Sequence, residues 1–293
     1  KTGEVLALVS LPSFDNNEPA KFLSDKRQPL FNRAISGLYS PGSTIKPLVG
    51  LAALQEKVIT PVFTVYSPGY LEIPNPYDPE KPIRFPDWKA HGTVDLYSAL
   101  ARSSNVYFYV VGGGCPARNN GVCGSGKKGL GIKRLNDYWR KFGLAEKTGI
   151  DLPGEGVSFL PDSEEKEKRT SQPWRIGDTY NVSIGQGDLT LTPLRLLTFF
   201  AGVANDGKVM KPTLLFGKEP ELALDFSDMQ EAIKEVKKGL RDAVSKNYGT
   251  ANLLFDLDYK TSGKTGSVQV ANKQRLNAFF VGYGPSEDPQ IAI

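Results

Sequence analysis

The sequence is poor in histidine and cysteine, and each shortage excludes a class of site. Its 293 residues contain one histidine, His91, and two cysteines, Cys115 and Cys123. A catalytic zinc site that relies on several histidines cannot be assembled from this set, and a serine–histidine–aspartate triad could use only His91. If the protein is a nucleophilic enzyme, we therefore expect its general base to be a lysine or a carboxylate.

Long apolar runs and basic blocks are also absent from the sequence. No run approaches the roughly 18 apolar residues of a membrane span, and the 36 basic and 32 acidic residues are spread along the chain rather than gathered among aromatic residues. We therefore expect no nucleic-acid partner. With 40% hydrophobic and 23% charged residues, the composition is that of a globular protein with one large domain or two small ones.

The two cysteines enclose a short loop, residues 115–123, between glycine-rich flanks. Such a loop is typical of a surface excursion closed by a disulfide in an oxidising compartment. Two free thiols or a metal-binding pair are the alternatives. We expect Cys115 and Cys123 to form a disulfide.

Hydrophobic patterning predicts several helices in the middle of the chain. Apolar faces or runs that predict helices occur over residues 43–55, 96–111, 133–142 and 189–204, the last with Pro193 as a helix-start signal, and behind a capping-box signal at 227–230. The mixed-charge run at 162–169 predicts a solvated helix face. Residues 11–42 and 60–92 are rich in turn-forming residues and are expected to be loop or irregular extended chain.

Predicted strands lie near the two ends of the chain. β-Branched and apolar residues predict strands at 4–10, 266–270, 278–283 and 290–293. This order predicts an α+β protein whose antiparallel sheet also takes in the N-terminal strand. Because the sequence begins and stops within strand-like segments, we expect residues 1–293 to be one domain of a longer protein.

The first candidate motif is Ser43-Thr44-Ile45-Lys46, at a predicted helix start. A spacing of three residues puts Ser43 and Lys46 on one helical face, so a neutral lysine amine could take the proton of an attacking hydroxyl. The helix N-terminus also offers unpaired N–H groups to a developing oxyanion. Alone the motif is weak, because a serine before a helix is commonly an N-cap.

The second candidate motif is Ser103-Ser104-Asn105. Ser103 could relay a proton, and Asn105 could bind a substrate amide. Alternatively, these small polar residues only begin or interrupt a helix.

The third candidate motif is Lys264-Thr265-Gly266, at a predicted strand start. The cation and the hydroxyl could hold a substrate carboxylate, while Gly266 could let an extended ligand approach the strand edge. A second amine close to Lys46 would lower the pKa of Lys46 and make it a better base. The alternative is a solvated lysine without a role in catalysis.

In this order, the three motifs form a set found in penicillin-binding proteins and class A β-lactamases. Over nearly its whole length the sequence resembles the transpeptidase domain of a class B penicillin-binding protein, most closely the elongation branch called penicillin-binding protein 2. Further matching stretches are residues 29–34, 37–43, 87–92, 149–155, 183–187, 192–193 and 249–251.

The resemblance implies a peptidoglycan D,D-transpeptidase with the fold shared by penicillin-binding proteins and serine β-lactamases. Ser43 would attack the carbonyl between the last two D-alanines of a stem peptide, and the amine of a neighbouring stem peptide would resolve the acyl-enzyme. β-Lactams would acylate Ser43 in the same way. The other implied catalytic residues are Lys46 as the base and Ser103 and Lys264 as proton relays. The implied substrate-binding residues are Asn105, Thr265, Gly266 and Ser267.

The resemblance also implies a cellular setting. The protein would act on the periplasmic face of the bacterial inner membrane, anchored by an N-terminal helix outside this sequence. Its partners would be a SEDS-family glycosyltransferase and other proteins of the elongation complex. No cofactor is implied. Some relatives hold zinc near the active centre with acidic residues, a histidine and a cysteine, which leaves Asp87 and His91 as weak candidate ligands. Because Ser104 stands where the cysteine is expected, we predict no metal.

Three other functions share parts of this pattern. A class A β-lactamase needs a deacylating glutamate, but Glu155, Glu164 and Glu165 do not lie in a Glu-x-x-x-Asn segment. A β-lactam receptor would be acylated only to signal. A pseudoenzyme scaffold would have no reason to keep Ser43, Lys46 and Lys264.

Overall fold

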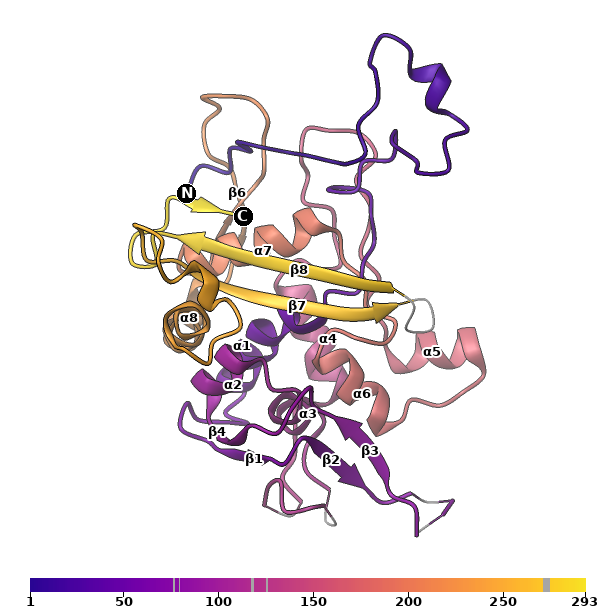
Figure 1. The fold of residues 1–293 in the computed structure, drawn as a ribbon, viewed down its shortest axis with the longest axis vertical. Coiled ribbons are helices and arrows are strands. Elements are labelled where there is room, and N and C mark those ends of the chain that lie inside the picture. The colour runs from indigo at the N-terminus through magenta and orange to yellow at the C-terminus, as the bar shows by residue number, and fades with distance from the viewer. Residues whose placement is uncertain (76, 79, 117–118, 125, 271–274) are drawn as a thin grey trace.

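The computed structural model describes residues 1–75, 77–78, 80–116, 119–124, 126–270 and 275–293. Figure 1 shows two long strands, β7 (Ser262–Val270) and β8 (Arg275–Gly284), crossing the molecule with helices packed around them. The short strands β1 to β4, within residues 65–94, lie together at the bottom of this view. This arrangement of separate helical and antiparallel parts confirms the predicted α+β class.

The main sheet consists of the last three strands of the chain, in the order β7-β8-β9 and antiparallel throughout. Its strands are β7 (Ser262–Val270), β8 (Arg275–Gly284) and β9 (Ile291–Ala292). Helix α8 (Gln230–Ser245) packs along β7, and α7 (Pro193–Ala204) packs against β8 and β9. β7 is therefore an edge strand of this sheet, and it packs against α8 and against residues 42–45.

The helical body is built around two buried helices, α1 (Lys46–Gln55) and α3 (Asn105–Gly113). Both are apolar on all sides, and a helix of that composition is stable only when it is enclosed by other elements. Every residue of α1 from Lys46 to Ala53 is buried. The surrounding helices are α2 (Leu96–Arg102), α4 (Gly131–Lys141), α6 (Ile176–Ser183) and α8.

Short two-stranded sheets complete the fold. They pair β1 (Val65–Ser67) with β4 (Gly92–Val94), β2 (Tyr70–Ile73) with β3 (Ile83–Pro86), and β5 (Lys208–Met210) with β6 (Leu222–Asp225). The region 60–92, predicted to be irregular, therefore contains strands. The remaining elements are α5 (Ser163–Thr170) and the 3₁₀ turns η1 (Pro19–Phe22), η2 (Gly42–Ile45), η3 (Ser227–Met229) and η4 (Asn252–Leu254).

The N-terminal strand prediction is wrong. Residues 4–10 form no strand, and the β-pairing found for them within the described part of the chain is an isolated bridge between Glu4 and Thr213. Leu6 and Val9 are 74% and 70% exposed. An apolar run becomes a strand only where a sheet edge accepts it; here the N–H of Val5 donates to Thr213 O at 2.8 Å, outside the main sheet.

Two helix predictions also need correction. The helix predicted over 96–111 is two helices, because Ser103 adopts the left-handed conformation (φ 58°) and ends α2, while the Ser104 side chain caps α3. The capping box predicted at 227–230 is wrong, since neither η3 nor α8 begins with a side-chain cap. Instead, Asp225 Oδ1 accepts a hydrogen bond from the N–H of Ser227 at 2.8 Å.

Several local features follow the predicted pattern. The mixed-charge segment forms α5, which buries no residue. Cys115 and Cys123 are joined by a disulfide with a Cα–Cα distance of 6.3 Å, and Tyr66 of β1 donates its N–H to Val122 O inside this loop. No helix in the described part of the chain combines the length and apolarity that crossing a membrane requires.

Candidate active site

The structure brings the three sequence motifs to one place. Lys46 starts α1, Ser103 lies in the turn between α2 and α3, and Lys264 is the third residue of β7. Lys46 Nζ donates to Ser103 O at 2.8 Å and to Asn105 Oδ1 at 2.7 Å. Lys264 Nζ donates to Ser103 Oγ at 2.8 Å. Two amines that are 218 positions apart in the chain (264 − 46) therefore meet at one residue, Ser103: Lys264 bonds its hydroxyl, and Lys46 bonds its carbonyl oxygen and lies 3.5 Å from its hydroxyl.

Ser43 lies in the 3₁₀ turn η2 rather than in the α-helix that was predicted to begin there. Residues three apart in a 3₁₀ turn are eclipsed, so Ser43 and Lys46 share a face. The N–H of Lys46 bonds Ser43 O, and Pro47, which has no N–H to donate, follows at once. Thr44, Ile45 and Lys46 are buried, whereas Ser43 is only partly buried. The nucleophile candidate is therefore the residue of this motif that a ligand can reach.

Turn η2 is held between β7 and the loop after α6 by glycines. A Cβ on Gly266 would lie 2.9 Å from Pro41 O and from Thr44 Cγ2, and a Cβ on Gly42 would lie 2.5 Å from Val268 Cγ2. On the other side, the N–H of Gly42 donates to Gly185 O at 2.9 Å. Gly266 therefore allows a close approach by the chain itself, and the ligand approach expected there stays a prediction.

Burial explains the electrostatics of the two lysines. Both are completely buried, and charged amines are costly in such surroundings. Burial lowers the pKa of Lys46 from 10.5 to about 7, although the negative charge of Asp87 opposes this shift. Burial, followed by the nearby Lys46 charge, lowers the pKa of Lys264 well below 10.5.

The hydrogen bonds of a neutral Lys46 would leave its lone pair available to act as a base. A neutral amine has two N–H donors and one lone pair, and Lys46 directs its two shortest bonds to the oxygens of Ser103 and Asn105. Its lone pair is then free to accept a proton. Ser103, which contacts both amines, can pass a proton between them because a hydroxyl donates and accepts at once.

Of the predicted substrate-binding residues, Asn105 begins α3, and Thr265, Gly266 and Ser267 lie along β7. Ser267 is exposed and Thr265 is partly buried. Thr265 Oγ1 bonds Thr250 Oγ1 at 2.7 Å, and the N–H of Thr250 donates to Ala101 O at the end of α2. Sequence reasoning assigned no role to Thr250, which was noticed only as part of a matching stretch. Its contact ties the third motif to the helix that carries the second.

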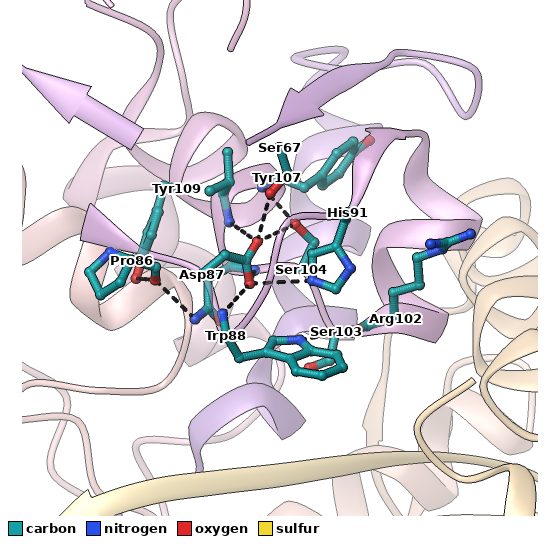
Figure 2. Close-up of polar contacts among 12 residues, drawn as sticks. Ser67, Pro86, Asp87, Trp88, His91, Arg102, Ser103, Ser104, Tyr107 and Tyr109 are labelled. Atoms are coloured by element: carbon teal, nitrogen blue, oxygen red, sulfur yellow. Dashed lines mark hydrogen bonds and ion pairs between the residues drawn. The ribbon is translucent and has the colours of Figure 1, made fainter. Parts of the chain in front are cut away.

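Asp87 was predicted only as a weak metal ligand, but it is the centre of a polar cluster beside the second motif (Figure 2). Burial raises the pKa of its carboxyl. His91, the charge of Lys46 and the backbone N–H groups of Asn105 and Val106 more than offset this effect, so the pKa lies well below 3.8. The carboxylate is therefore an anion at neutral pH.

Asp87 and His91 do not fit a zinc site. His91 Nε2 lies 3.5 Å from Asp87 Oδ1, and the neighbouring positions are the hydroxyls of Ser67 and Ser104, which are poor zinc ligands compared with thiolate, imidazole or carboxylate. Among the described residues, no group of three or more His, Cys, Asp or Glu side chains is placed to hold a metal.

Comparisons with known proteins agree on one family. The family model for the penicillin-binding protein transpeptidase domain matches residues 1–293. The chain is 35% identical to the peptidoglycan D,D-transpeptidase MrdA of Haemophilus influenzae, covering 100% of this chain and 48% of that protein. A crystal structure of penicillin-binding protein 2 from Pseudomonas aeruginosa superposes with a TM-score of 0.82 at 35% identity, covering 99% of this chain and 65% of that one.

A second structural relative was solved with a partner. Penicillin-binding protein 2 of Helicobacter pylori, in a complex with MreC, has a TM-score of 0.80 and 31% identity, covering 95% of this chain and 49% of that one. The chain spans about half the length of the curated relatives it matches, such as the 48% of the Haemophilus protein.

Proposed function

The chain belongs to the penicillin-binding protein transpeptidase family, and we propose that it cross-links peptidoglycan as a serine D,D-transpeptidase acylated at Ser43. The observation that carries the proposal is the convergence of two buried lysines on Ser103, one turn from the partly exposed Ser43. Such an arrangement supplies a buried amine of lowered pKa on the same face as Ser43, three residues after it, and a base in this position is what activation of a serine hydroxyl requires.

In the acylation step, Lys46 takes the proton of Ser43 as Oγ attacks the carbonyl between the two terminal D-alanines of a stem peptide. The oxyanion that forms is stabilised by the N–H groups of Ser43 and Ser267. Collapse of this intermediate breaks the C–N bond. The proton held by Lys46 reaches the leaving D-alanine amine through Ser103, with Lys264 keeping the hydroxyl oriented.

In the transfer step, the amine of a second stem peptide attacks the Ser43 ester. Its proton returns through the same relay to Ser43 Oγ, a new peptide bond forms, and the serine is free again. Asn105 binds the donor amide and Thr265 binds the terminal carboxylate. The 2.7 Å contact between Thr265 and Thr250 fixes the hydroxyl that does so.

Labelling with a β-lactam tests this proposal. Incubation with benzylpenicillin should add one adduct per chain, mapped by peptide mass spectrometry to residue 43, and Ser43→Ala should abolish it. A stem-peptide donor with a free acceptor amine should yield a cross-linked product. An adduct on another residue, or none, would contradict the proposed function. Rapid turnover of a chromogenic cephalosporin would instead favour a β-lactamase.

The setting of the whole protein belongs to the same proposal. We expect it to act at the periplasmic face of the inner membrane, anchored outside this chain, and to work with a SEDS-family glycosyltransferase in cell-wall elongation. The Helicobacter relative in complex with MreC supports such a partnership. So does a relative at 32% identity that was solved as part of a peptidoglycan synthase complex.

A further inference from the structure

The carboxylate of Asp87 is enclosed by donors from several segments of the chain (Figure 2). Asp87 follows β3 directly, and its side chain is completely buried. It accepts five hydrogen bonds of 2.7–3.1 Å, from the hydroxyls of Ser67 and Ser104 and from the N–H groups of Trp88, Asn105 and Val106. A carboxylate offers about four lone-pair sites, so this one is saturated by the protein itself.

Two of these donors belong to the first turn of α3. The first N–H groups of a helix have no partner within the helix, and an anion at this end is favourable. Asp87 satisfies the N–H groups of Asn105 and Val106, while Ser104 caps the same turn and donates its hydroxyl to Asp87. The carboxylate therefore binds the first turn of α3 together with its N-cap, Ser104.

The residue before Asp87 orients the Asn105 side chain. Pro86 O accepts a hydrogen bond from Asn105 Nδ2 at 3.3 Å and another from Tyr109 Oη at 3.1 Å. With its amide nitrogen held there, Asn105 must turn Oδ1 the other way, toward Lys46. One loop thus fixes both the backbone and the side chain of the second motif.

Building on the proposed function, we infer that Asp87 is a positioning residue that holds the Ser103–Asn105 turn through a metal-free hydrogen-bond network, and so sets the rate at which Ser43 is acylated. Ser103 and Asn105 touch the reacting groups, whereas Asp87 acts through them. The side chains that contact Asp87 from β1 and from the turn before α3 are the hydroxyls of Ser67 and Ser104. Zinc would need thiolate, imidazole or carboxylate ligands at these positions.

Asp87→Asn tests this inference, with Asp95→Asn as its matched control. Asp95 caps the neighbouring helix α2 by accepting from the N–H of Ser98 at 2.9 Å, far along that helix from Ser103. We expect Asp87→Asn to slow labelling by a fluorescent penicillin about 10- to 100-fold, because displacing a reacting group by about 1 Å costs up to 100-fold. We expect Asp95→Asn to label at the wild-type rate, because the amide oxygen can still accept the N–H of Ser98 and cap α2.

The shape of the labelling curve separates positioning from instability. A variant that is only less stable contains fewer folded molecules. Those molecules label at the wild-type rate, and the final amount of labelled protein is lower. A displaced turn leaves every molecule labelling slowly to one adduct per chain. A wild-type rate in Asp87→Asn, or an equal loss of rate in Asp95→Asn, would overturn the inference. Absence of label on wild-type Ser43 would instead refute the proposed function.

Two further measurements keep the test decisive. If Asp87→Asn does not fold, Ser67→Ala removes one of the five donors and should slow labelling about two- to fivefold at full final amount, within the range of one lost hydrogen bond; an unchanged rate would count against the network. A strong chelator should leave the labelling rate and the melting temperature of the wild type unchanged. If chelation lowers either quantity and added zinc restores it, a metal holds the Ser103–Asn105 turn and the inference is wrong.

Discussion

Lysine occurs in this protein in two contrasting settings, the interior of the active site and the solvated surface of α5. Lys46 and Lys264 are fully buried, and no carboxylate within the described residues lies within ion-pairing distance of either amine. Lys168 on α5 is 80% exposed and lies 3.7 Å from Glu164, one turn away. The buried amines bond oxygens without full charge, whereas the surface amine faces a carboxylate in water.

The contrast shows where the protein accepts an energetic cost. An exposed ion pair contributes little to stability in either direction. A buried amine must lose its proton or remain charged in an apolar interior, and both outcomes oppose folding. The fold nevertheless keeps two such amines beside Ser103, as the proposed proton relay requires.

The largest expected effect comes from removing the buried base. Lys46→Met should lower the rate of Ser43 acylation by about 10²- to 10⁴-fold, because general base catalysis is lost. The fold should tolerate the change, since methionine fills a similar volume and has no charge to bury. Stopped-flow or gel-based penicillin labelling gives the rate, and thermal melting gives the stability. A labelling rate within threefold of the wild type would remove Lys46 from the mechanism.

The same residue predicts how stability depends on pH. The pKa of Lys46 is about 7 in the folded protein and 10.5 when unfolded. Between these values the unfolded chain binds the extra proton, so stability rises with pH across this window. Lys264 shifts in the same direction. The gain in melting temperature from pH 7 to pH 10 should therefore be smaller in Lys46→Met than in the wild type. Equal gains would mean that Lys46 stays charged in the folded state.

A smaller effect is expected where the second and third motifs are joined. Thr250→Val keeps the shape of the side chain but removes the hydroxyl that bonds Thr265 at 2.7 Å. Net contributions of single hydrogen bonds of about 0.5–1.5 kcal/mol predict a two- to tenfold weaker non-covalent affinity for penicillin. The saturated acylation rate should change much less. If only the saturated rate falls, Thr250 acts on the proton relay and not on carboxylate binding.

These sites differ in how far the sequence could predict them. The spacing of Ser43 and Lys46 was enough to place them on one face, because residues three apart are neighbours on the surface of both a 3₁₀ and an α-helix. Lys264 could be joined to them only through family resemblance, since no local pattern specifies a contact across 218 positions (264 − 46). The charged run of α5 was predictable because nothing there depends on distant partners.

Other features depended on long-range contacts and were missed. Residues 4–10 have the composition of a strand, but no edge of the main sheet accepts them in this structure. The break at Ser103 requires a left-handed residue, and serine carries no strong signal for that conformation. The role of Asp87 arises from donors on β1, the loop after β3 and the start of α3, which are adjacent only after folding.

The smallest effect is expected at Lys168, the exposed lysine of α5. Lys168→Met is the same substitution as Lys46→Met, but it removes an exposed partner of Glu164 on α5. Because exposed pairs at this spacing contribute little, the melting temperature should change by less than about 2 °C and the labelling rate should not change. A loss of acylation comparable to that of Lys46→Met would break the comparison, since the effect of removing an amine would then not depend on its burial beside Ser103.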